Sequence, residues 1–126
     1  MKPTESELEI MQILWDEGPM TVRMVNERLN EQRKVGYTTT LKIMQIMVEK
    51  GLLTRDTSQR SHVFSPTLSS ESVQSSVVDH ILKTVFRGSS SSLVMQALGN
   101  HRVSGSELEE IRQLIEKMEE QADDHI

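Results

Sequence analysis

The sequence predicts a mainly α-helical protein with one small β-hairpin. Apolar residues recur at helical spacing over most of the 126 residues, and this spacing gives way to short strand-like runs only after Gly51. The composition agrees, because 36% of residues are hydrophobic but only 3% are aromatic, which suits a thin helical core. A chain of this length forms one ordinary domain or two small ones that lean on each other or on a partner.

The first two helices are predicted from their caps and their spacing. Thr4 followed three residues later by Glu7 is typical of a capping box, so we expect a helix to begin between Pro3 and Glu5. Gly18-Pro19 should end it. Thr21 is then a suitable N-cap for a second helix that runs from residue 22 to about residue 32.

A third helix and a hairpin follow. The third helix is predicted from about Thr38 to Lys50, with Gly51 in the position expected after a helix C-terminus. Residues 52–55 and 61–65 are candidate strands on either side of a polar turn, and Pro66 should end the second strand. Three helices and then a hairpin are characteristic of a winged helix-turn-helix, which we assign to residues 1–67.

The rest of the chain, residues 68–126, is predicted to be helical. Apolar residues recur every four positions from Val73, while Ser89 and Ser104 are candidate N-caps for two further helices. Their apolar faces need a cover. They could fold back on the N-terminal domain, but we favour packing against the same segment of a second chain.

One face of the third helix suits contact with DNA. At about 100° per residue, Thr38, Lys42, Gln45 and Glu49 gather on one narrow arc, with Thr39 and Ile46 at its margin and the apolar residues opposite. Thr and Lys donate to phosphates or bases, and Gln can pair with adenine. An ordinary amphipathic surface helix would show the same split. The candidate DNA contacts around this face are Tyr37, Thr38, Thr39, Lys42, Gln45, Arg33, Lys34 and Arg60.

The charge is distributed unevenly along the chain. The net charge of −5 argues at first against nucleic acid, which is bound through local positive charge. Residues 28–60, however, carry seven basic and three acidic residues, a balance of +4, and the flanking segments are acidic. The predicted third helix and wing therefore fall in the basic stretch.

Several blocks of the sequence resemble the penicillinase repressor family (BlaI, MecI and CopY type). TESELEIMQILWDEGPMTVRMVNERL is similar to the family's opening, GYTTTLKIMQIMVEKGLL to its recognition helix and RSHVFSP to its wing strand. VFRGSSSSLVMQAL and SGSELEEIRQLI resemble its dimerisation region. The blocks occur in the family's order and together cover nearly the whole chain.

The resemblance implies a bacterial homodimeric repressor that binds a dyad operator in double-stranded DNA. It places a winged helix-turn-helix on each subunit and interlocking helices at the C-terminus. It also implies that a membrane-sensor metalloprotease cleaves the dimerisation region. The residues that the resemblance assigns to the dimer interface are Leu82, Phe86, Leu93, Val94, Leu98, Leu108, Ile111 and Leu114.

The chain departs from the family pattern in two places. Copper-responsive members carry a C-terminal cysteine cluster, and this chain has no cysteine, so copper sensing by thiolates is excluded. Antibiotic-responsive members are cleaved at an Asn-Phe bond, where this chain has Gln96-Ala97. These two residues mark the candidate cleavage region.

Other functional classes find little support. The four histidines match no metal-ligand spacing, and the sequence has neither a nucleophile elbow nor a phosphate-binding glycine loop, so we expect no enzyme activity, metal or cofactor. No apolar run approaches the roughly 20 residues of a membrane span, which favours a cytoplasmic protein without membrane insertion. The alternative function is a winged-helix module that binds another protein and does not bind DNA specifically.

Overall fold

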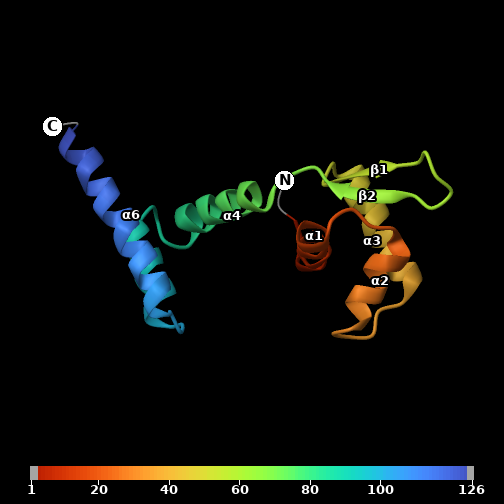
Figure 1. The fold of residues 1–126 in the computed structure, drawn as a ribbon, viewed down its shortest axis with the longest axis horizontal. Helices are drawn as coiled ribbons and strands as arrows, with labels where there is room; N and C mark the ends of the chain where they lie inside the picture. The colour runs from red at the N-terminus through yellow and green to blue at the C-terminus, as the bar shows by residue number, and fades with distance from the viewer. Residues whose placement is uncertain (1–2, 125–126) are drawn as a thin grey trace. The chain divides into compact units, whose positions relative to one another are not determined.

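The computed structural model describes residues 3–124, which form six helices and one two-stranded sheet. The mainly helical class with a small hairpin is thereby confirmed. The chain divides into two compact units, the first ending at Asp79 and the second beginning at His80. The elements in chain order are α1 Glu5–Glu17, α2 Val22–Asn30, α3 Tyr37–Glu49, β1 Leu53–Asp56, β2 Val63–Pro66, α4 Ser70–Thr84, α5 Ser90–Gly99 and α6 Gly105–Asp124 (Figure 1).

The predicted caps of α1 and α2 are confirmed. The Thr4 hydroxyl accepts from the backbone N–H of Glu7 at 3.2 Å, and the Glu7 carboxylate accepts from the backbone N–H of Thr4 at 2.9 Å. The Thr21 hydroxyl accepts from the backbone N–H of Met24 at 3.3 Å. Both caps satisfy N–H groups that have no partner within their own helix, so each helix begins where its sequence signal lies.

The hairpin lies one to two residues later than the sequence indicates. Leu53 pairs with Pro66 and Asp56 with Val63 in an antiparallel register, so the predicted first residues of both strands fall outside the ladder. Pro66 is the last residue of β2 instead of the residue after it. The Asp56 carboxylate accepts from the backbone N–H of Ser58 at 2.9 Å and starts the turn, which leaves a loop of residues 57–62 that extends away from the helices (Figure 1).

The core of the first unit lies where α3 packs against α1, α2 and β1. Its centre is built from unbranched and branched aliphatic side chains, with Phe64 as its buried aromatic residue among those described. Met11, Met44 and Met47 are fully buried there, and their flexible thioethers fill the irregular spaces between the helices. This packing fixes the buried side of α3 and leaves its other side free.

The start of α4 belongs to the first unit. The indole N–H of Trp15 donates to the backbone carbonyl of Leu68 at 2.9 Å, and Val73 joins the buried core. The division between the two units at residues 79 and 80 therefore falls inside α4. The sequence-based boundary between residues 67 and 68 stays a prediction about which part of the chain folds alone.

The second unit consists of the end of α4 with α5 and α6. The predicted caps are confirmed: the hydroxyl of Ser89 accepts from the backbone N–H of Ser92, and that of Ser104 accepts from the backbone N–H of Glu107. The turn after α4 includes Arg87 at a φ of 52°, a left-handed conformation that is uncommon for a residue with a side chain.

Candidate nucleic-acid interface

The side of α3 that faces away from the core is polar. Thr38, Thr39, Lys42 and Gln45 are exposed. On the opposite side of the helix, Thr40, Met44 and Met47 are buried against α1 and α2, as the helical spacing predicted. Burial of one side therefore holds the polar side outward.

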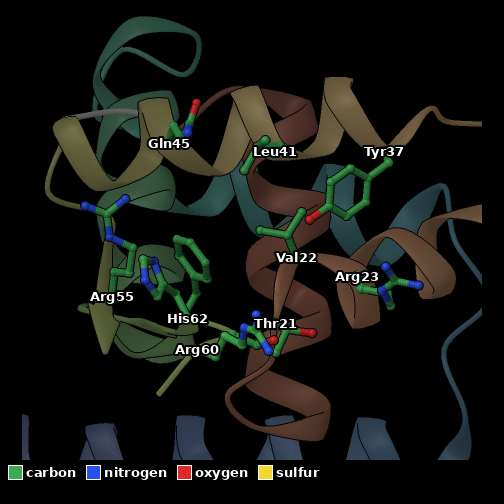
Figure 2. Close-up of a pocket in the computed structure, with 11 residues that line it drawn as sticks. Thr21, Val22, Arg23, Tyr37, Leu41, Gln45, Arg55, Arg60 and His62 are labelled. Atoms are coloured by element: carbon green, nitrogen blue, oxygen red, sulfur yellow. The ribbon is translucent and has the colours of Figure 1, made fainter. Parts of the chain in front are cut away.

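A groove lies between this helix, the beginning of α2 and the hairpin. Its volume is about 400 Å³. Figure 2 shows Tyr37, Leu41 and Gln45 along α3 on one side of the groove, with the hairpin residues facing them. The groove is lined by Thr21, Val22, Arg23, Tyr37, Leu41, Gln45, Arg55, Arg60, Ser61, His62 and Phe64.

The lining of the groove is cationic. Arg23, Arg55 and Arg60 contribute three guanidinium groups, His62 adds an imidazole, and no lining residue carries a carboxylate. Arginine side chains present several N–H donors in a planar fork that matches the geometry of a phosphate group. Tyr37 and Gln45 add polar groups along the helix side. The groove is therefore suited to a polyanion that runs between α3 and the hairpin.

The structure brings some of the sequence-predicted residues to this groove and leaves others outside it. Tyr37, Gln45 and Arg60 line it. Thr38, Thr39 and Lys42 lie on the exposed side of α3 outside its lining, while Arg33 and Lys34 lie in the exposed turn between α2 and α3.

Three cations of the basic stretch are paired with carboxylates of the fold. The Arg28 guanidinium pairs with the carboxylate of Glu17 on α1 at 2.7 Å. The Arg33 guanidinium pairs with the carboxylate of Glu9 on α1, whose hydrogen bond and charge raise the pKa of Arg33. The Lys50 ammonium pairs with the buried carboxylate of Glu7 at 2.9 Å. The positive balance of residues 28–60 therefore overstates the charge that this stretch offers to a ligand.

The groove lining also includes Arg23 and His62, which the sequence did not indicate as DNA contacts. Arg23 lies in the acidic N-terminal segment, so counting charge along the chain hides it. Arg55, a cation of the basic stretch in the predicted wing, lines the groove as well. It follows buried Leu53 by two residues and so lies on the same face of the strand.

Among the described residues, no helix is long and apolar enough to cross a membrane.

The first unit has the defining features of a winged-helix protein: three helices, a hairpin after the third, and an exposed polar side on that third helix. The chain belongs to the penicillinase repressor family, whose model matches residues 3–117. This is a family of transcriptional repressors, and the identification made from the sequence is confirmed.

Individual relatives are similar over almost the same span. The penicillinase repressor of Bacillus licheniformis is 26% identical over 115 residues, which cover 90% of this chain and 89% of that protein. The transcriptional regulator BlaI of Mycobacterium tuberculosis is 28% identical over 115 residues, covering 90% of this chain and 82% of that regulator. The similarity thus includes the helical second unit as well as the winged helix.

Proposed function

We propose that this chain is a homodimeric, sequence-specific repressor that binds double-stranded operator DNA through α3 and the hairpin. The observation that carries the proposal is the groove between them, which contains three arginines and no carboxylate. A phosphate backbone seated there would release condensed counterions, which is the main source of affinity in most protein–DNA contacts. The total charge of −5 does not oppose this, because the acidic residues lie outside the groove lining.

In this proposal the exposed side of α3 reads the bases while the groove holds the backbone. Thr38, Thr39 and Lys42 lie beside this groove and Gln45 lines it. All four side chains project from α3 into the major groove of the operator. Arg60, in the hairpin loop, contacts the DNA backbone next to them. Contacts to phosphates set the register on the duplex, and contacts to base edges provide the sequence specificity.

A second copy of the chain binds the other half of a dyad operator. Dimerisation through the second unit is supported by its exposed apolar side chains: Val94 is 45% exposed, Leu114 57% and Met118 58% in the single chain. No described residue after Val73 is buried in the single chain. Clusters of this kind typically mark an interface between proteins.

Release of the operator is proposed to follow cleavage by a membrane-sensor metalloprotease. Gln96 and Ala97 are exposed near the end of α5, so a cut between them would detach α6 from the winged helix. Each half-site would then lose the advantage of its tethered neighbour, and operator affinity would fall without any change at the DNA-binding face.

A gel-shift across the protein's own promoter region tests DNA binding. The wild-type protein should shift this duplex at lower concentration than a scrambled duplex, with affinity that falls steeply as salt rises. Combining Lys42→Ala with Arg60→Ala should weaken the shift, whereas Arg112→Ala, which removes a charge from exposed α6, should not. A shift with little salt dependence and no preference for either duplex would favour the alternative, a winged-helix module that binds another protein.

A further inference from the structure

The beginning of α3 lacks the side-chain cap that α1 and α2 have. Its N-cap residue is Gly36, which has no side chain to accept from the first turn. Residues 31–36, which lead into it, form a turn that contains exposed polar side chains and Gly36. The position of α3 must therefore be fixed by contacts from outside the helix.

Asn30, the last residue of α2, makes one set of these contacts. Its side-chain NH₂ donates to the backbone carbonyl of Val35 at 2.8 Å, and its side-chain oxygen accepts from the backbone N–H of Val35 at 3.1 Å. The same NH₂ group donates to the carbonyl of Asn26 at 2.7 Å. Asn30 thus satisfies both backbone groups of the residue two positions before α3 begins.

Asn26, one turn earlier on α2, makes the second set. Its NH₂ donates to the carbonyl of Val35 at 3.0 Å and to the hydroxyl of Thr40 at 2.9 Å. Thr40 is fully buried, and its hydroxyl donates onward to the carbonyl of Gly36 at 3.3 Å. One side chain on α2 therefore holds both the turn and the first turn of α3.

We propose that Asn26, Asn30 and Thr40 form an asparagine clasp that positions α3 for reading operator bases. The apolar contacts between α2 and α3 are not directional and tolerate small rotations of one helix on the other. The hydrogen bonds of the clasp are directional and come from α2, so they fix the first turn of α3, where Tyr37, Thr38 and Thr39 lie. This inference rests on the proposed function, because it concerns how α3 meets DNA.

The clasp should act on specificity more than on general DNA affinity. The arginines of the groove lie on α2 and the hairpin, not on α3, so they can hold a phosphate backbone even when the first turn of α3 shifts. Base edges are read only at hydrogen-bond distance, and a small shift of the reading side chains breaks such contacts. If these residues only stabilised the fold, substituting them would instead weaken specific and non-specific DNA binding by the same factor, because both depend on the fraction of folded protein.

The experiment compares Asn26→Ala and Asn30→Ala with wild-type protein and with Asn100→Ala. Asn100 is a matched control, because its NH₂ also donates to the carbonyl four residues earlier, but in the second unit. Affinity is measured for the duplex of the protein's own promoter and for a scrambled duplex of the same composition. Circular dichroism confirms that each variant is folded, and the exchange of the Val35 amide hydrogen reports on the clasp without DNA.

We expect Asn30→Ala to speed exchange at the Val35 amide, whose N–H donates to the Asn30 side chain. Both clasp variants should lower the preference for the promoter duplex about tenfold, the equivalent of one hydrogen bond. Binding to the scrambled duplex should stay within about twofold of wild type, because phosphate contacts supply it. A folded variant that keeps the wild-type preference, or that weakens both duplexes equally, would overturn the clasp. A wild-type protein without any preference would instead refute the proposed function.

Discussion

The ion pair between Glu7 and Lys50 joins the start of α1 to the end of α3, and its removal should destabilise the winged helix. The Glu7 side chain is only 4% exposed, and its carboxylate accepts from Lys50 Nζ at 3.0 and 2.9 Å and from the backbone N–H of Thr4 at 2.9 Å. Lys50→Met keeps most of the aliphatic stem but removes the ammonium group. The Glu7 carboxylate then remains buried, and among the described residues the backbone N–H of Thr4 is left as its hydrogen-bond donor.

The expected cost follows from this burial. Removing one partner of a fully buried ion pair typically costs about 3–5 kcal/mol, because the remaining charge is left without compensation. The Lys50 side chain is 31% exposed, so water reaches part of this pair, and we expect a loss of about 2–3 kcal/mol. For a unit of this size, that loss lowers the melting temperature by roughly 10–20 °C.

The effect should also depend on pH. Burial on its own raises the pKa of Glu7, but the hydrogen bonds from the Thr4 backbone and from Lys50, with the charge of Lys50, outweigh it and hold the pKa below its usual value of 4.5. A carboxylate with a lowered pKa stabilises the fold above its unfolded pKa, and this contribution is lost as pH falls through the folded pKa. Wild-type stability should therefore decline below about pH 4.5, whereas Lys50→Met should show a weaker decline.

Urea unfolding followed by the fluorescence of Trp15, the single tryptophan of the chain, measures these differences in the first unit. Lys34→Met is the matched control, because Lys34 is exposed in the same unit. A Lys50→Met variant that loses less than about 0.5 kcal/mol, the range of ordinary surface substitutions, would contradict the reasoning. So would an unchanged response to pH.

Three further predictions concern the groove, the domain boundary and the dimer. Arg23→Ala and Arg55→Ala should each reduce the salt dependence of DNA binding. The slope of log affinity against log salt concentration should become less steep by about 0.9 for each phosphate that the arginine neutralises. An unchanged slope would place that arginine outside the interface. A chain ending at Asp79 should keep the core contact of α4 and have a higher melting temperature than a chain ending at Thr67. Equal melting temperatures would show that α4 does not stabilise the winged helix. Leu114→Asp should convert a dimer to a monomer in light scattering, and wild-type protein that is already monomeric would refute the proposed interface.

Much of the fold could be predicted because its signals are local. Thr4, Thr21, Ser89 and Ser104 each cap a helix through a backbone group three residues away, so neighbouring residues encode the start of the helix. The two sides of α3 follow from spacing in the same way. The hairpin is harder to place, because its register depends on pairing across the loop and not on either strand alone.

The distribution of charge around the candidate site was harder to predict, because it depends on contacts between distant segments. Glu7 and Lys50 are 43 residues apart, and nothing in either neighbourhood indicates their pairing. Arg23 lies in an acidic segment and reaches the groove only because α2 packs against α3 and the hairpin. Arg33 lies in the basic stretch and pairs with α1 instead. Folding thus sorts the charges differently from their order along the chain.

Selection of bound duplexes from a random-sequence library with the full-length protein tests the central claim most directly. If α3 reads bases and two chains bind together, the selected duplexes should share an inverted repeat whose half-sites lie a whole number of helical turns apart. Arg60→Ala should select the same repeat with lower yield, because it removes a backbone contact and leaves the reading side of α3 intact. Selected duplexes without any shared sequence would contradict the claim that this protein is a sequence-specific repressor.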